Sequence, residues 1–544
     1  MTFVNTAIVG RVWRQPARLS SRAEKSGGLS PHPTYTQTAL SLMRPVLFLI
    51  IASSALAQVG PNYERPATAT SPKFKGVTWR AATPSAHLPK GEWWKVFNDS
   101  RLNNLVAAAT ANNQQLKAAI ARFDQARAAA RMSRGDFFPT ISLPLSAETQ
   151  QTSENMPSPF PLNGLRYHGP AYNAPLDFSW ELDLWGKLRR QSEGTRADAA
   201  AAADSMHNVL LGIQAEVAVN YFKLRTLDNE MRIVREAVGW RNEALKIASA
   251  RVQAGAGSEL EQAQAETEVA TAEAEISSLQ AQRDQLENVL AILIGTSASS
   301  FRVPTSTGTL SSPPSVPAGV PSDLLERRPD ISQAERVLEA ATARIGVAKS
   351  HFFPSVKLMG RGGFQSGDID ILFEPTSLMW SMGPSISVPL FSGNKNRWNL
   401  TKSKAAHDEA LAGYRQAFLA ALADVETSLS SIRNLSTQAG SQQRARTSAE
   451  KAAQLAKTRY EAGTSPYLDV IEANRTTLAT QRATAQIAGQ RLIATVGLMK
   501  ALGGGWDQKA PVSMPATTPD PAARNLDQDK PGFFSKVKGL FSKD

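Results

Sequence analysis

The sequence predicts a mixed α and β fold in which each half carries amphipathic strands and one long helical hairpin. Three observations lead to this prediction. Long helix-forming stretches turn at two matching glycines, and short stretches alternate apolar with polar residues. A Phe-Phe-Pro break occurs once in each half, at Phe137 and again at Phe352. Recurrence of the same features in the same order in both halves indicates an internal duplication.

The two hairpin turns share one design. Arg251-Val-Gln-Ala-Gly-Ala-Gly-Ser is matched 208 positions later by Arg459-Tyr-Glu-Ala-Gly-Thr-Ser-Pro. Glycine suits the left-handed end of a helix, and Ser, Thr or Pro suits the first turn of the next one. The turn residues are Gly255, Gly257, Ser258, Gly463, Thr464 and Ser465. Apolar residues from Leu224 to Val252 follow a heptad spacing, so an unbroken helix over 186–253 would be about 100 Å long.

The clearest strand is 176–184, and a second alternating stretch covers 378–390. Weaker strands begin at Ile141 and Val356. The expected lipid-facing residues are Leu176, Phe178, Trp180, Leu182, Trp380, Ile386 and Val388. The opposite, lumen-facing row holds Asp177, Glu181 and Asp183. The long helices use their apolar seams on one another, so these strand faces have no soluble partner and fit a membrane barrel.

Four strands cannot close by themselves, and an open edge is not tolerated in lipid. Membrane insertion would therefore require two, three or four chains, giving eight, twelve or sixteen strands. Periodicity alone does not choose among these. The ordinary alternative is a soluble sandwich whose apolar faces form a core, and the small number of strong strands disfavours it.

Composition excludes several functions. The chain has no cysteine, and its six histidines are scattered without metal-ligand spacing. Residues 1–57 contribute +5 of the net charge of +12. The remaining +7 is spread with both signs interspersed, which is a solvated surface and not a nucleic-acid stripe. No Gly-x-Ser-x-Gly turn or phosphate loop is present. We expect no enzymatic activity, no catalytic residue, no cofactor and no metal.

The front of the chain reads as an export signal. Residues 43–57 have a basic start, a short apolar core and an Ala-x-Ala end. We expect translation to begin at Met43 and the mature chain at Gln58. The expected divisions are 1–57 (upstream extension and signal), 58–295 (first half), 296–321 (linker), 322–506 (second half) and 507–544 (disordered tail with a possible amphipathic end).

Several segments resemble the outer membrane factor family, the TolC-like exit ducts of efflux and secretion systems. They are Val59-Gly-Pro-Asn-Tyr-Glu-Arg-Pro66, Glu92-Trp-Trp94, Asp323-Leu-Leu-Glu-Arg-Arg-Pro-Asp-Ile331, both Phe-Phe-Pro breaks and Lys500-Ala-Leu-Gly-Gly-Gly-Trp506. The likeness is greatest to the lipoprotein branch that serves resistance-nodulation-division pumps. Relatives there carry a lipidated cysteine two residues before Val-Gly-Pro, where this chain has Ala57. Lipid anchoring at this site is therefore not expected.

The resemblance implies a homotrimer with a twelve-stranded outer-membrane β-barrel, four strands per chain, continuous with a long α-helical periplasmic barrel and an equatorial belt that includes 296–321. It implies that the two hairpin turns dock a periplasmic adaptor. It also implies that Asp469 and Glu472 form carboxylate rings at the tunnel mouth, a lining that favours cations.

The expected function is passive exit of drugs or other small molecules, or of type I secretion cargo, through the outer membrane of a Gram-negative bacterium. The expected partners are outer-membrane lipid, the adaptor and an inner-membrane resistance-nodulation-division transporter. The competing interpretation is a periplasmic coiled-coil adaptor. The duplication and the paired amphipathic strands count against it.

Overall fold

The computed structural model describes residues 58–67, 92–151, 168–306, 308, 310–314 and 328–504. The chain divides into two units, 1–56 and 57–544, and all described residues belong to the second. Some expectations lie outside the described residues: the signal segment with its start at Met43, linker residues 315–321 and the tail 507–544.

The main helices form two sets of equal length. In the first half, α3 (Gln114–Gly135), α4 (Lys187–Gln253) and α5 (Glu259–Leu293) have 22, 67 and 35 residues. In the second half, α7 (Pro329–Ser350), α8 (Lys395–Glu461) and α9 (Tyr467–Ala501) again have 22, 67 and 35. These matching lengths agree with the internal duplication predicted from the sequence. The first half also holds the 3₁₀ helix η1 (Trp93–Phe97) and helix α2 (Ser100–Asn112).

The strands form one antiparallel sheet. Its members are β1 (Thr140–Ser142), β2 (Ser146–Gln151), β3 (His168–Leu182), β4 (Ser355–Ser366) and β5 (Leu378–Ser387). The order is β1-β3-β4-β5, and β2 also pairs with β3. The central pair, β3 with β4, joins the two halves of the chain. The short 3₁₀ helix η3 (Pro375–Ser377) precedes β5.

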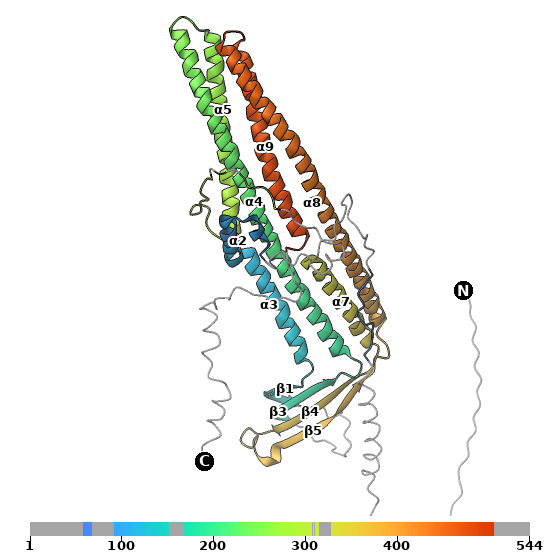
Figure 1. Ribbon diagram of the computed structural model, residues 1–544. Helices are drawn as coiled ribbons and strands as arrows, with labels where there is room; N and C mark the ends of the chain where they lie inside the picture. The colour runs from blue at the N-terminus through green and yellow to red at the C-terminus, as the bar shows by residue number, and fades with distance from the viewer. Residues whose placement is uncertain are drawn as a thin grey trace, which may run out of the picture. The chain divides into compact units, whose positions relative to one another are not determined.

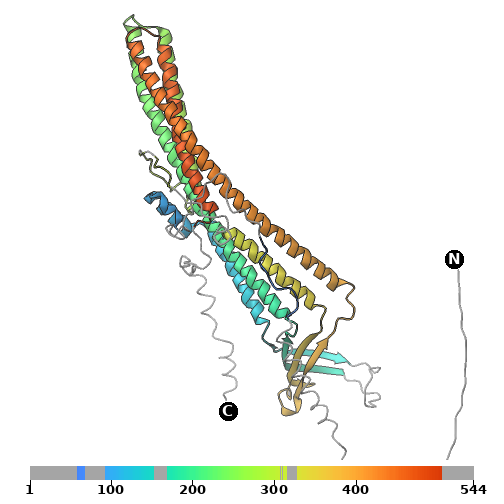
Figure 2. The same cartoon turned by 45° about the vertical axis from the view of Figure 1, so that its right-hand side comes forward.

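The two long hairpins, α4–α5 and α8–α9, lie beside each other with their turns at the same end, and the sheet lies at the opposite end (Figure 1). Helix α4 is central: it packs against α3, α5, α7 and α9. Helix α8 contacts α7 and α9 and lies at the edge of the helical layer (Figure 2). Among the described helices, none combines the length and the apolar character needed to cross a bilayer.

The largest core lies midway along the helices, where η1 and α2 pack on α4. Trp93, Leu102 and Leu224 are fully buried there, together with Leu290 of α5 and Leu492 of α9. A second core runs between the hairpins and contains Met231, Val234 and Leu279. Met231 and Val234 of α4 occupy heptad positions, so the seam predicted along α4 is confirmed there.

The first linker residues are held against the hairpin by a buried charge cluster, which we call the equatorial clamp: Asp228, Arg283 and Glu287. Arg283 Nε donates to Asp228 Oδ1 at 2.8 Å, and Arg283 Nη2 donates to the carbonyl of Val303 at 2.5 Å. The backbone N–H of Ser306 donates to Asp228 Oδ2 at 3.1 Å, and that of Val303 donates to Glu287. Each charge is paired and hydrogen-bonded, as buried charges require.

The strand boundaries differ from the sequence-based ones in three places. The first expected strand is split into β1 and β2 around Pro144, because proline has no N–H for the ladder. Strand β3 begins earlier, at His168, and ends at Leu182, so Asp183 lies beyond it. Strand β5 ends at Ser387, so Val388 also lies beyond its strand.

Candidate functional site

The register places all the apolar rows on one face of the sheet. Residues directly opposite each other in an antiparallel pair point to the same side. The rows across β3, β4 and β5 are Ala174–Phe364–Leu378, Leu176–Gly362–Trp380, Phe178–Gly360–Met382, Trp180–Leu358–Pro384 and Leu182–Val356–Ile386. Ile141 of β1 extends the third of these rows. The sheet therefore has one continuous apolar face, which we call the apolar sheet face.

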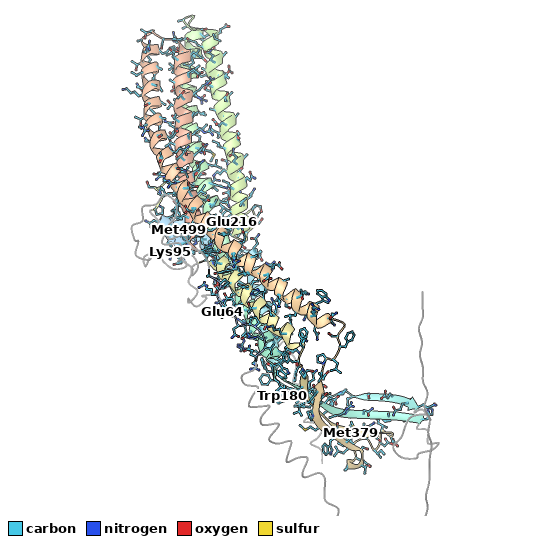
Figure 3. The ribbon with its side chains drawn as sticks, turned by 90° about the vertical axis from the view of Figure 1, so that its right-hand side faces the viewer. Glu64, Lys95, Trp180, Glu216, Met379 and Met499 are labelled. Atoms are coloured by element: carbon cyan, nitrogen blue, oxygen red, sulfur yellow. The ribbon has the colours of Figure 1, made fainter. Side chains whose placement is uncertain are left out.

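Much of this face is open to solvent within the single chain. Trp380 is 79% exposed, Ile386 64% and Leu176 51%. Phe178, Trp180 and Leu182 are half-buried. Trp180 lies where the sheet meets the helices (Figure 3), and its indole Nε1 donates to the carbonyl of Phe137 at 2.9 Å. A surface of this size and polarity indicates a membrane or protein contact.

The opposite face of the sheet carries paired charges. Asp177 Oδ1 accepts from Arg361 Nε at 3.0 Å, directly across the β3–β4 pair. Glu181 Oε1 accepts from Lys187 Nζ at 2.9 Å. These two carboxylates occupy the face predicted to line the lumen, but each has a basic partner that the strand pattern did not indicate.

Asp183 has a different position from the one expected. It follows the strand, and its carboxylate accepts the backbone N–H groups of Leu188 and Arg189 at 3.1 and 3.0 Å. Arg189 Nε also donates to it at 3.2 Å. Carboxylates favour the amino end of a helix because unpaired N–H groups point out there. Asp183 therefore fixes the start of α4, a local role that alternation along a strand does not reveal.

Both hairpin turns close with the same hydrogen bonds. The N–H groups of Gly255 and Ala256 donate to the carbonyls of Val252 and Arg251, both at 2.9 Å. Gly463 and Thr464 donate in the same way to Tyr460 and Arg459, again at 2.9 Å. Gly255 and Gly463 have φ values of 70° and 73°, the left-handed conformation expected for them.

The remaining turn residues start the return helices. Ser258 Oγ accepts the N–H of Leu260 at 3.2 Å, as an N-cap does. An added Cβ at Gly257 would lie 2.7 Å from the nitrogen of Val252, so this close turn requires glycine. Ser465 precedes α9 directly before Pro466, its N-cap. All six turn residues thus lie where the sequence placed them, at the ends of the two hairpins.

The two turns are also joined to each other. Arg251 Nη1 of α4 donates to Tyr460 Oη of α8 at 2.7 Å. The Tyr460 hydroxyl lies 3.5 Å from Glu261 Oε2 of α5, and its ring packs on Tyr467 of α9 with centroids 5.4 Å apart. One tyrosine thus links all four helices at the tip, and we call this group the tip cluster.

Asp469 and Glu472 lie in the first two turns of α9, both exposed and on one helical face. Glu472 Oε1 accepts from Arg475 Nη1 at 2.9 Å, and Arg475 Nε also donates to Glu268 of α5 at 2.8 Å. Asp469 makes no side-chain ion pair with a described residue. The two carboxylates predicted as a pair therefore differ: one is partly neutralised and the other is not.

A charge ladder between the hairpins was not predicted from the sequence. Arg475 and Arg482 of α9, one heptad apart, pair with Glu268 and Glu275 of α5, which are also one heptad apart. Arg482 additionally contacts Glu230 of α4 at 3.3 Å. The sequence signal for this ladder was the seven-residue spacing between the two arginines and between the two glutamates. The four residues come together only when the two hairpins pack.

The segment 58–67, which we call the strap, lies along α4 and α7. The N–H of Val59 donates to the carbonyl of Trp185 at 3.1 Å, where the sheet ends. Farther along, Tyr63 Oη and Arg65 Nη2 donate to the carboxylate of Glu335 at 3.1 and 2.9 Å. Glu64 marks the strap beside the helices in Figure 3. The Val-Gly-Pro motif thus joins the sheet end to the helical wall.

Nothing in the described part of the chain resembles a metal centre: no group of three or more His, Cys, Asp or Glu is arranged to hold an ion. Its chemistry is that of surfaces: an apolar sheet face, a charge-balanced face behind it, and two linked hairpin tips with carboxylates beside one of them. Such a combination defines a membrane-inserted protein that extends helical arms into an aqueous compartment.

Comparison with known proteins agrees with this class. The model of the outer membrane efflux protein family matches residues 105–296 and 320–504. The pyoverdine export outer membrane protein OpmQ of Pseudomonas aeruginosa is 32% identical, over 83% of this chain and 96% of its own. The cation efflux system protein CusC of Escherichia coli is 27% identical, over 85% of this chain and 98% of its own.

A solved structure of the outer-membrane channel OprN has a TM-score of 0.75 and 32% identity, covering 82% of this chain and 99% of that one. The chain belongs to the outer membrane efflux protein family. It is therefore an outer-membrane protein of a Gram-negative efflux system, as its resemblance to the outer membrane factors predicted.

Proposed function

We propose that three copies of this chain form a twelve-stranded barrel in the outer membrane, continuous with a helical duct in the periplasm. The duct passively conducts drugs or other small molecules to the exterior. An inner-membrane resistance-nodulation-division transporter supplies them through a periplasmic adaptor. The observation that carries this proposal is the apolar sheet face, because five registered apolar rows leave much of one side of the sheet exposed in the described chain.

The ends of the sheet support assembly. In the described chain β5 pairs with β4 alone, while β1 and β2 pair with β3 alone. Lipid cannot hydrogen-bond an open strand edge, so each edge needs another strand. The β3–β4 pair already joins a first half to a second half. Because the two halves are duplicates, an equivalent pairing would join the β5 edge of one copy to the β1–β2 edge of the next. Three such pairings would close the ring.

The helices support the same arrangement. Within one chain, α7 of the second half packs against α4 of the first half. The duplication makes α3 equivalent to α7 and α4 equivalent to α8. We therefore expect α3 of the next copy to pack against α8 in the same way. Helix α8 has the exposed apolar residues such a neighbour would cover, among them Trp398 at 64% and Leu419 at 59%. In detergent, the purified protein should have three times the mass of one chain. A monodisperse single chain would contradict the proposal.

The polar sheet face would line the barrel lumen. There Asp177 and Glu181 are each balanced by a base, so this part of the duct is close to neutral and suits varied cargo. Asp183 lies at the helical end of that face, with its carboxylate already engaged. The lipid-facing role falls to the apolar rows, and Val388 continues that surface just past β5.

The hairpin tips, Gly255 to Ser258 and Gly463 to Ser465, would meet the adaptor. Three copies of Asp469 and Glu472 would form carboxylate rings beside them. Because Glu472 already shares Arg475, Asp469 should carry most of the field at the opening. Rings of carboxylates favour cations.

Planar-bilayer recordings test this constriction. Asp469→Asn should weaken cation selectivity or raise conductance more than the matched Glu472→Gln, and the double variant should change both most. If all three variants gave the same currents as the wild type, Asp469 and Glu472 would not form a constriction. The trimer and the exit function would still stand.

The competing function is a periplasmic adaptor. Its coiled-coil hairpin would explain the helices, but it gives no use for a continuous apolar sheet face. Fractionation separates the two: an outer-membrane duct gives heat-resistant oligomer bands in the outer-membrane fraction. An adaptor would leave that fraction after mild salt or carbonate washing.

A further inference from the structure

The loop between β4 and β5, residues 367–377, exposes large apolar side chains. Ile369 is 59% exposed, Ile371 43% and Phe373 71%. It lies at the end of the sheet away from the helices, because β4 starts soon after α7 and β5 runs back toward α8. We call this segment the outer loop.

The outer loop is held in one shape by its own contacts. Ser377 Oγ donates to the carbonyl of Ile371 at 2.8 Å, and the N–H of Glu374 donates to the same carbonyl at 3.1 Å. Leu372 is turned inward and is only 8% exposed. The exposed side chains are therefore presented by a fixed turn.

Phe373 continues the apolar sheet face. The last row that crosses all three strands contains Phe364 and Leu378, which are directly opposite each other. Beyond it Tyr172 of β3, opposite Ser366, continues the same side of the sheet. The ring of Phe373 packs edge-on against Phe364, with centroids 5.6 Å apart. The outer loop thus adds an aromatic layer at that end of β4, on the side of the sheet where Tyr172 extends β3.

The height of the face explains why this layer matters. The rows from Val356 to Phe364 extend about 27 Å along the strand, or about 20 Å of depth at a tilt of about 40°. Outer-membrane barrels have an apolar band about 25 Å tall, flanked by aromatic girdles. The rows that cross all three strands fall short of this band. Aromatic side chains at the end near Phe373, which include Tyr172 of β3, reduce the shortfall.

We propose that the outer loop lies in the outer leaflet of the membrane, at the boundary between acyl chains and headgroups, and binds lipid through Ile369, Ile371 and Phe373. This inference rests on the proposed function, in which the sheet crosses the outer membrane with its helices in the periplasm. The carboxylates of Asp368, Asp370 and Glu374 are exposed within the same segment and set its depth. Three charges would not enter hydrocarbon, so the loop lies at the boundary.

The chain has no cysteine, so a single introduced one gives an unambiguous label. The variants Phe373→Cys and Ile369→Cys are each labelled with a nitroxide and reconstituted into phosphatidylcholine–phosphatidylglycerol vesicles. Electron paramagnetic resonance then compares how often each label collides with oxygen, which enters the bilayer, and with a nickel chelate, which stays in water. Met382→Cys on the apolar sheet face and Ser381→Cys on the opposite face are the controls. Ile369→Cys leaves the Phe364–Phe373 ring contact intact.

Both loop labels should favour oxygen severalfold more than the label at Ser381 and less than the label at Met382. Loop labels as accessible to nickel as the Ser381 label would overturn the inference, because the loop would then lie in water or fold over the mouth of the barrel. Failure of the proposed function looks different: the Met382 label itself would lose its preference for oxygen.

Discussion

Helices α4 and α8 are duplicates in length and opposites in environment. Both have 67 residues, and equivalent positions are 208 apart. Leu211 of α4 is 8% exposed, whereas its counterpart Leu419 of α8 is 59% exposed. The same residue in the same helix is core in one half and surface in the other. The difference arises because α4 packs against α3, α5, α7 and α9 of its own chain, whereas α8 lies at the edge and contacts α7 and α9.

The equator differs between the halves as well. The clamp residues Asp228 and Glu287 have Ser436 and Thr495 as counterparts, while Arg283 corresponds to Arg491. Arg283 is 5% exposed and fully paired. Arg491 is half-buried and makes no side-chain hydrogen bond or ion pair with a described residue. Both halves have the arginine, but only the first half has the carboxylates that make it a clamp.

The largest expected effect comes from breaking the clamp. Arg283→Met removes the buried cation that Asp228 and Glu287 share, and leaves them only the more distant Arg225 and Arg302, at 3.5 and 3.7 Å. Removing one partner of a buried pair costs about 3–5 kcal/mol. Arg491→Met, its duplicate, should change stability by less than about 0.5 kcal/mol, as surface changes do. Denaturant unfolding followed by helical circular dichroism measures both. Equal losses would show that the halves are not as different at the equator as their contacts indicate.

The leucine pair sharpens the same comparison. Leu211→Ala should destabilise the fold by about 2–5 kcal/mol, because it empties a space in a packed core. Leu419→Ala should leave the unfolding of a detergent-separated chain unchanged and reduce the fraction of trimer at low protein concentration. Analytical ultracentrifugation of both variants separates the two effects. A trimer that is indifferent to Leu419→Ala would mean that another surface covers α8.

Much of this architecture followed from local sequence signals. Gly255 and Gly463 predicted both hairpin ends, because a left-handed residue ends a helix whatever its surroundings. The alternation from Leu176 to Leu182 predicted the apolar face of β3. The strand predicted to run to residue 184 ends at Leu182, because continuing an alternating pattern cannot reveal that Asp183 binds the first N–H groups of the next helix. The clamp and the charge ladder were missed, because their partners meet only after the hairpins pack.

The tip cluster gives a smaller effect. Tyr460→Phe removes the hydrogen bond from Arg251 but keeps the ring on Tyr467, and an ordinary hydrogen bond contributes about 1 kcal/mol. Amide hydrogen exchange at the two turns should increase, while exchange at the equator stays unchanged. Tyr467→Phe is the matched control, because its hydroxyl makes no hydrogen bond with a described residue. Identical exchange in both variants would mean that the Tyr460 hydroxyl does not hold the two turns together.

The smallest expected effect concerns pH and again separates the halves. Burial lowers the pKa of His207 on α4 below its usual value, whereas its counterpart on α8 is Arg415, which does not titrate. Below pH about 6.5 the unfolded chain takes up a proton on His207 more readily than the folded one. This contribution to stability is therefore complete above that pH and is lost as pH falls through 6.5 toward the lowered value.

His207→Gln should flatten the decline in unfolding free energy between pH about 7 and 5 relative to wild type, by no more than about 1 kcal/mol. Burial raises the pKa of nearby Asp204, which gives the opposite sign in acid. Asp204 is present in both proteins, so the difference between the two pH curves isolates His207. Superimposable curves would mean that this histidine is solvated in the assembled duct, and that the neighbours of α4 enclose it less tightly than they enclose Leu211.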